Sequence, residues 1–137
     1  MSSEPSNPCS TSRARRSPTP TRRTRAFGSA RAFATSSGQL YAGCNVENAS
    51  YPVTQCAEAT AIGAMVAAGE RQVVEVVIVT EGMEPCPPCG RCRQQLAEFA
   101  SATTRVHLCG PDGVRLTATL GELLPMAFGP NTLNRPT

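Results

Sequence analysis

Three cysteines and one glutamate carry the strongest chemical signal in this sequence. Cys56 opens a Cys-Ala-Glu motif, and Cys89 and Cys92 lie in a Pro-Cys-Gly-Arg-Cys motif, with Cys89 33 residues after Cys56. Both motifs fall where we expect helices to begin, and a thiolate there is stabilised by the helix dipole and by free backbone N–H groups. Three thiolates leave tetrahedral zinc with one open position, which is typical of catalytic rather than structural sites. We therefore predict a zinc site with water as the fourth ligand.

Glu58 follows Cys56 by two residues and would lie beside that water without binding the metal. Zinc lowers the pKa of water toward neutrality, so Glu58 could accept a proton and leave a hydroxide that attacks an electron-poor carbon. A structural zinc site or inert thiols are the alternative, because Cys86, Cys89 and Cys92 are evenly spaced. Glu58 alone could equally be a solvated acid of a first helical turn. The Cys-Ala-Glu motif favours the catalytic interpretation.

Alternating strand and helix patterns predict the elements that position these residues. Residues 73–80 (VVEVVIVT) are nearly all β-branched and predict a central strand covered on both faces. Helices are expected at 56–68, with Thr54 as N-cap and Gly69 as the stop, and at 89–100. Shorter elements are expected as strands at 39–46, 106–108 and 114–118 and as a helical turn at 120–124. This alternation predicts an α/β domain in which helices cover a sheet.

Composition changes sharply near residue 34. Residues 1–34 hold seven Arg against one acid, Glu4, whereas residues 35–137 hold six Arg against nine acids. The first segment has few large apolar residues, which predicts a disordered basic tail. The acidic remainder gives no electrostatic reason to expect nucleic acid as a partner. We expect one domain over 35–130, followed by a C-terminal tail at 131–137.

The cysteine content and the lack of long apolar stretches bear on location. No stretch approaches the ~18 consecutive apolar residues of a membrane span, and the first residues lack the apolar run of a secretory signal. We therefore expect a cytoplasmic protein without a membrane partner, in which the seven Cys are metal ligands or buried thiols rather than disulfides. Cys9, Cys44 and Cys109 are expected to be buried or incidental. His107 is expected to be a packed or surface residue of a strand.

Several ordered blocks resemble the small homotetrameric class of cytidine deaminases, within the cytidine and deoxycytidylate deaminase superfamily. Cys-x-Glu followed by Pro-Cys-x-x-Cys is the known signature of zinc deaminases. The other similar blocks are Gly-Cys-Asn-Val-Glu-Asn-Ala-Ser-Tyr-Pro at 43–52, Leu-Ala-Glu-Phe at 96–99, Leu-Gly-Glu-Leu-Leu-Pro at 120–125 and Phe-Gly-Pro at 128–130. The resemblance implies a three-layer α/β fold with a mixed central sheet covered by helices, and one Zn²⁺ per subunit. It also implies hydrolytic deamination of cytidine and deoxycytidine to uridine and deoxyuridine in pyrimidine salvage.

The same resemblance implies roles for individual residues. Asn45 and Glu47 resemble the residues that hydrogen-bond the ribose hydroxyls, and Ala57 resembles the residue whose backbone touches the pyrimidine edge. Glu58 would move protons to N3 and then to the departing ammonia. Phe128 would close the pocket of a neighbouring subunit, which implies a homotetramer that acts on a small-molecule nucleoside.

Two other functions share these motifs. An aminonucleoside deaminase related to blasticidin resistance has the same zinc motifs and a Cys-Gly-Arg-Cys loop, although the block at 45–51 favours cytidine. A catalytically impaired zinc-binding homologue is the second alternative, because the sequence upstream of Thr35 departs from the family.

Two departures from the family pattern lead to hypotheses. Many relatives have Arg after the catalytic Glu where this chain has Ala59, and three thiolates leave a zinc centre with net negative charge. We expect Arg91 or Arg93 to compensate that charge. Upstream of Thr35 the first helix and strand of the family are missing. With suitable codons, residues 20–31 read one base earlier can spell the missing peptide, so we hypothesise that 1–34 is a frame-shifted segment.

Overall fold

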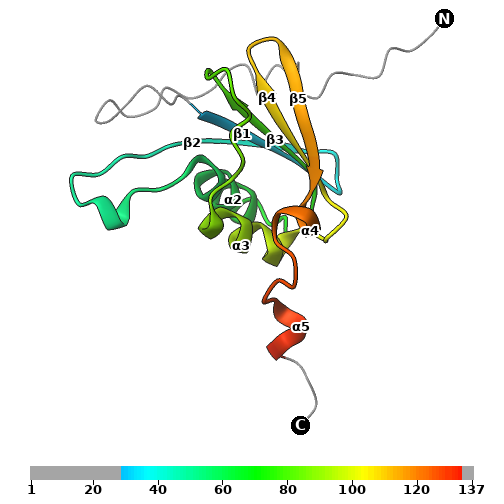
Figure 1. Cartoon of the computed structure of the whole chain (residues 1–137). Coiled ribbons are helices and arrows are strands. Elements are labelled where there is room, and N and C mark those ends of the chain that lie inside the picture. Colours follow the sequence, from blue (N-terminus) through cyan, green and yellow to red (C-terminus); the bar gives the residue numbers. More distant parts are fainter. Residues whose placement is uncertain (1–28, 134–137) are drawn as a thin grey trace, which may run out of the picture.

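The computed structural model describes residues 29–133, which form a five-stranded sheet with helices packed against it (Figure 1). The strand order is β2-β1-β3-β4-β5. The strands are β1 (Ser29–Thr35), β2 (Leu40–Cys44), β3 (Val73–Thr80), β4 (Arg105–Gly110) and β5 (Gly113–Thr119). β3 and β4 are parallel and the other neighbours are antiparallel, so the predicted mixed sheet is confirmed.

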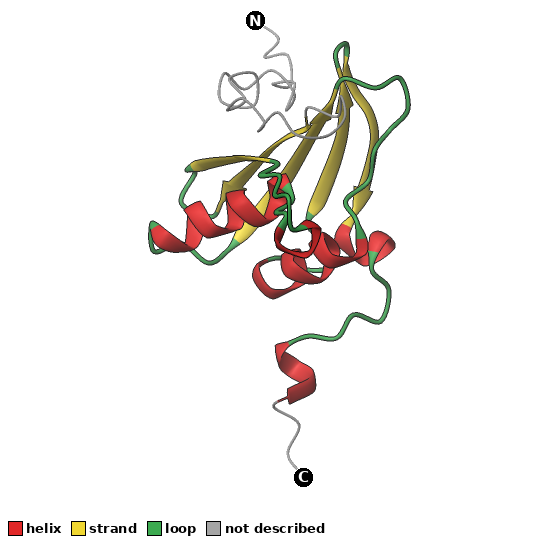
Figure 2. Ribbon diagram, turned by 90° about the vertical axis from the view of Figure 1, so that its left-hand side faces the viewer, coloured by secondary structure: helices red, strands yellow, loops and turns green. Residues whose placement is uncertain are grey.

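Two helices carry the metal motifs, α2 (Ala57–Ala67) and α3 (Gly90–Phe99). The shorter helical elements are the 3-10 turn η2 (Tyr51–Val53), α4 (Leu120–Leu123) and α5 (Pro130–Leu133). α2, α3 and α4 lie on one side of the sheet, and α5 follows an extended segment that leads away from it (Figures 1 and 2). α5 crosses the boundary expected between residues 130 and 131, so a helix begins where a tail was predicted. Each helix among the described residues is too short or too polar to cross a membrane.

The start and end of α2 follow from the residues that flank it. Cys56 is the N-cap rather than the predicted Thr54, because Gln55 is still held in an extended bridge to Val46 by two backbone hydrogen bonds of 2.9 Å. Gly69, with φ of +88°, follows the last turn, and its N–H donates to Val66 at 3.0 Å. The predicted glycine stop is therefore confirmed.

The expectations of disorder up to residue 34 and of a missing first strand are wrong for residues 29–34, which belong to β1. β1 pairs with both β2 and β3, and Phe33 lies opposite Val76 with its side chain fully buried. The Ser, Ala and Arg content of this segment hid the strand from composition, since pairing on both sides compensates for weak local preference. The expectations for the missing first helix, for Cys9 and for the start of the 1–34 segment concern residues outside the described ones.

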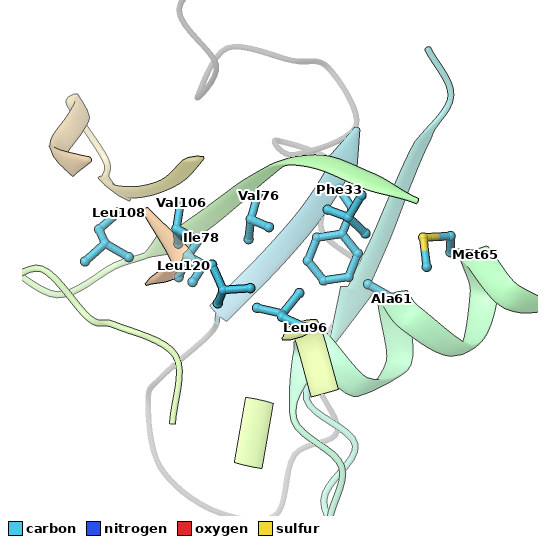
Figure 3. Packing of buried hydrophobic residues seen from close by; sticks show 10 residues of the cluster. Phe33, Ala61, Met65, Val76, Ile78, Leu96, Val106, Leu108 and Leu120 are labelled. Carbon is cyan, nitrogen blue, oxygen red and sulfur yellow. The ribbon is translucent and has the colours of Figure 1, made fainter. Parts of the chain in front are cut away.

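The hydrophobic core lies between the sheet and the helices that carry the metal motifs. Its buried side chains include Phe33, Val76, Ile78, Val106 and Leu108 from the strands and Ala61, Met65, Leu96 and Leu120 from the helices (Figure 3). Each large side chain buried here stabilises the fold by about 2 kcal/mol relative to exposure. The core therefore fixes α2 and α3 on the sheet.

A polar cluster lies on the opposite face of the sheet. His107 alternates with core residues along β4 and is 6% exposed. Its Nε2 lies 2.7 Å from Oε1 of Glu75, and its Nδ1 lies 2.8 Å from Oγ1 of Thr117. Arg105 lies 3.4 Å from the same Glu75 oxygen. His107 is thus a packed strand residue, as expected. The nearby Cys109 is 3% exposed and is disulfide-bonded, so the expectation of a thiol rather than a disulfide is wrong for this residue.

Candidate metal centre and active site

Three cysteine sulfurs meet where α2 and α3 begin. Cys56 is the N-cap of α2, Cys89 is the N-cap of α3, and Cys92 lies in the first turn of α3. The sulfur of Cys89 is 3.9 Å from that of Cys56 and 3.4 Å from that of Cys92, and all three lie within 4.8 Å of one another. Zinc–sulfur bonds of about 2.3 Å in a tetrahedron place the sulfurs about 3.8 Å apart. The spacing and the thiol donor set therefore fit one zinc ion.

The three cysteines differ in exposure. Cys92 is fully buried, Cys56 is half-buried and Cys89 is exposed. A metal held here would be anchored from the interior by Cys92 and reachable from solvent past Cys89. Three protein ligands leave one tetrahedral position for a water molecule or a substrate atom.

The protein environment shifts the pKa values of the three thiols by different amounts and in different directions. Burial raises the pKa of Cys92 far above its ordinary value, and the negative charge of Glu58 adds to this effect. Burial also raises the pKa of Cys56. At Cys89 burial acts in the same direction, but hydrogen bonds with the Cys92 backbone and with the Cys92 and Cys56 side chains outweigh it and lower the pKa. A bound cation is what would stabilise all three thiolates together.

Glu58 lies beside this cluster in the first turn of α2. It is 2% exposed, and its negative charge acts to raise the pKa of each of the three thiols. Burying a carboxylate costs free energy unless a neighbouring charge compensates it. The position of Glu58 therefore suits an acid that works next to a cation.

The segment that the sequence assigns to ribose binding is joined to the start of α2. Oδ1 of Asn45 accepts a hydrogen bond from the backbone N–H of Ala57 at 3.1 Å. Glu47 is half-buried and lies two residues after Asn45. It directly follows Val46, which pairs with Gln55 in an isolated β-bridge. The structure thus brings Asn45 and Ala57 into contact. The backbone bridge between Val46 and Gln55 holds Glu47 near the same end of α2.

The two arginines of the second motif differ in their contacts. Arg93 donates through Nε to the Pro88 carbonyl at 2.8 Å and through NH1 to the Leu123 carbonyl at 2.6 Å. Arg91 is exposed, and its guanidinium forms no hydrogen bond to a described residue. Because Pro88 precedes Cys89, the Arg93 guanidinium lies next to the metal motif.

Phe128 lies in the segment between α4 and α5. Its carbonyl accepts a hydrogen bond from Nε2 of Gln94 at 2.8 Å, and the residue is 56% exposed. The single chain therefore leaves more than half of this aromatic residue to solvent.

Sequence reasoning missed three residues that hold the site in place. A Cβ on Gly43 would lie 2.3 Å from the Ala57 carbonyl oxygen and 2.4 Å from Oγ1 of Thr60, so β2 and α2 are in direct backbone contact there. Arg115 donates to the Gly82 carbonyl at 2.6 Å and so fixes the start of the loop that leads to Cys89. A glycine inside a strand is a known signal of close backbone approach. Thr60 and Arg115 had no such signal.

Comparison with known sequences places both metal motifs in one family. A sequence model of the family described as "Cytidine and deoxycytidylate deaminase zinc-binding region" matches residues 10–108. The cytidine deaminase of Halalkalibacterium halodurans is 43% identical over 97 residues, covering 71% of this chain and 74% of that protein. The cytidine deaminase of Mycobacterium tuberculosis H37Rv is 37% identical over 99 residues, covering 72% and 70%.

Solved structures share the fold as well as the sequence. The cytidine deaminase of Burkholderia pseudomallei superposes with a TM-score of 0.70 at 40% identity, covering 74% of this chain and 82% of that one. The enzyme of Mycobacterium leprae gives 0.63 at 37% identity, covering 73% and 80%. With the matched region spanning Cys56, Cys89 and Cys92, this chain belongs to the cytidine and deoxycytidylate deaminase family and carries its zinc-binding region.

Proposed function

We propose that this protein catalyses the zinc-dependent hydrolytic deamination of cytidine and deoxycytidine to uridine and deoxyuridine. The observation that carries the proposal is the convergence of Cys56, Cys89 and Cys92 beside the buried Glu58. The relatives and structural neighbours that are named cytidine deaminase support the substrate class. The three cysteines would hold one zinc ion per chain.

The proposed chemistry assigns the proton transfers to Glu58. Zinc, when bound, lowers the pKa of a water molecule enough to supply hydroxide near neutral pH. Glu58 accepts the first proton of that water and delivers it to N3 of the pyrimidine while a C4–O bond forms. Glu58 then passes the second proton to the amino group, the C4–N bond breaks and ammonia leaves. The backbone of Ala57, one residue before Glu58, orients the edge of the pyrimidine.

The direct test is to express the chain, measure its zinc by elemental analysis and follow the loss of cytidine absorbance. Turnover of cytidine with little turnover of blasticidin S supports the proposal. Zinc at about one per chain without ammonia release would instead indicate a catalytically impaired homologue.

We propose that Asn45 and Glu47 bind the ribose hydroxyls. A hydrogen bond to a charged group contributes about 1.5–3 kcal/mol, so Glu47→Gln is expected to raise KM for cytidine by about 10- to 100-fold and to change kcat little. Steady-state kinetics on cytidine measure the effect, with the exposed Glu81→Gln as the matched control. An unchanged KM in Glu47→Gln would remove Glu47 from the sugar site.

We propose that Arg93 compensates the negative charge of the zinc centre, which its contact with the Pro88 carbonyl supports. Arg93→Ala is expected to weaken zinc affinity by about tenfold or more, because groups around the ligands tune metal binding by that amount. Competition with a chelator measures the affinity. Arg91→Ala is the matched comparison, with a smaller effect since Arg91 is exposed. If both variants keep full zinc affinity and turnover, charge compensation by these arginines is ruled out.

We infer further that the enzyme acts as a homotetramer in the cytoplasm and serves pyrimidine salvage. Phe128 would enter the pocket of a neighbouring subunit, and its exposure on the segment that leads away from the sheet supports this role (Figure 1). Residues 35–137 hold nine acids against six Arg, which supports a small nucleoside rather than a nucleic acid as the substrate. Light scattering on the zinc-loaded protein measures the number of chains.

A further inference from the structure

Thr60 connects the helix that carries Glu58 to the strand end that leads into Asn45. Its Oγ1 donates to the Cys44 carbonyl at 2.8 Å and accepts from the Cys44 N–H at 3.0 Å. The same oxygen lies 3.0 Å from the Ala57 carbonyl. One hydroxyl group therefore bonds both backbone groups of Cys44 and contacts the first turn of α2.

This junction between β2 and α2 leaves little room for adjustment. A Cβ at Gly43 would lie 2.3 Å from the Ala57 carbonyl oxygen, so the two backbones already touch. The hydrogen bond of 3.1 Å from the Ala57 N–H to Asn45 adds a second link one residue beyond Cys44. Residues 45–47, the sugar segment, and the first turn of α2 with Glu58, the catalytic turn, thus form one unit. The Thr60 hydroxyl lies between them.

We propose that Thr60 is a positioning residue that sets the distance between the sugar segment and the catalytic turn, and thereby the preference for nucleosides that carry the 3′-hydroxyl. The inference rests on the proposed function, in which Asn45 and Glu47 hold the sugar while Glu58 moves protons at the base. A nucleoside bound at both ends is sensitive to this distance, because misplacement by about 1 Å can cost about 100-fold in rate. A nucleoside that lacks the 3′-hydroxyl is held less firmly at its sugar end and is therefore less sensitive to this distance.

Thr60→Val keeps the shape of the side chain and removes its hydroxyl group. We expect the preference for cytidine over 3′-deoxycytidine, taken as the ratio of kcat/KM values, to fall about tenfold in Thr60→Val. Thr60→Ser keeps the hydroxyl and is expected to restore the wild-type ratio. A loss of folded protein alone would lower both kcat/KM values equally and leave the ratio unchanged. An unchanged ratio in Thr60→Val would therefore overturn the proposal.

Amide hydrogen exchange at Cys44 in the zinc-loaded protein provides a readout that does not depend on turnover. The Cys44 N–H loses its acceptor in Thr60→Val, so its exchange is expected to quicken about tenfold and to return to the wild-type rate in Thr60→Ser. Thr117→Val, which removes a hydrogen bond to His107 on the far face of the sheet, is the matched control and should leave this amide unchanged. Unchanged Cys44 exchange in Thr60→Val contradicts the positioning role.

Failure of the proposed function gives a different result. If the zinc-loaded wild type does not deaminate cytidine, the proposed function fails. The preference for cytidine over 3′-deoxycytidine is then measured from the dissociation constants of these two nucleosides. Equal affinities of the wild type for both nucleosides would overturn the positioning role as well. A wild-type preference that falls in Thr60→Val, together with faster Cys44 exchange, would uphold it.

Discussion

Glu58→Gln is expected to lower the turnover of cytidine by about 1,000-fold while the protein keeps its zinc. A positioned acid–base group contributes about 10²–10⁴-fold, and an amide of the same shape cannot carry the two protons. The three cysteine ligands are untouched by the change, so metal content stays near one per chain. Cytidine turnover and elemental analysis on the same preparation measure both quantities.

A matched control for this variant lies on α3. Glu98 is exposed, so Glu98→Gln removes the same charge from the chain without altering the buried site. It is expected to keep wild-type turnover. If zinc-loaded Glu58→Gln loses less than about tenfold, the proton transfers belong to another group and the role assigned to Glu58 is wrong.

The sequence predicted the elements whose pattern is local. β3 lies at 73–80 as expected, because a run of β-branched residues has few alternatives to a central strand, although Val74 is exposed and α2, α3 and α4 all lie on one side of the sheet (Figure 2). α2 and α3 begin within one residue of the expected positions, because the metal motifs mark their N-termini. β1 was missed, since its seven residues are ordinary in composition and gain their strand structure from β2 and β3 on either side.

The same distinction holds within the site. The clustering of Cys56, Cys89 and Cys92 could be predicted because the residue types and their motifs imply a shared metal. The bond between Thr60 and Cys44 joins residues that are 16 positions apart and depends on how closely β2 approaches α2. Periodicity and spacing do not report such a distance, so only the structure shows which hydroxyl links the two segments.

Removal of zinc is expected to reduce turnover by about 1,000-fold or more and to lower Tm by roughly 10 °C or more. The metal supplies several kcal/mol to the reaction, and a ligand bound only to the folded state stabilises it by mass action. Cys89→Ser should have the same two effects, because it removes one of the three ligands. Thermal unfolding and cytidine turnover before and after chelation, and again after zinc is restored, measure them.

The stability difference between zinc-loaded and metal-free protein should also depend on pH. The pKa values of Cys56 and Cys92 are raised above the ordinary 9.0, so in the metal-free fold their stabilising effect is present below about pH 9 and is lost as pH rises through the raised values. The pKa of Cys89 is lowered, so this thiol has a smaller effect on the stability of the metal-free fold, and that effect runs in the opposite direction as pH rises. Zinc keeps all three as thiolates, and its binding releases their protons. The Tm difference is therefore expected to widen from about pH 7 to about pH 10.

Cys86 separates the loss of a metal ligand from the loss of any cysteine in this loop. It lies three residues before Cys89 but outside the group of sulfurs that meet at the helix ends. Cys86→Ser is therefore expected to keep its zinc, its turnover and the Tm difference produced by chelation, whereas Cys89→Ser loses all three. Equal zinc loss in the two variants would show that Cys86 is a fourth ligand beside Cys56, Cys89 and Cys92, as in a closed structural site. In that case the open fourth position that the proposed chemistry requires would not exist.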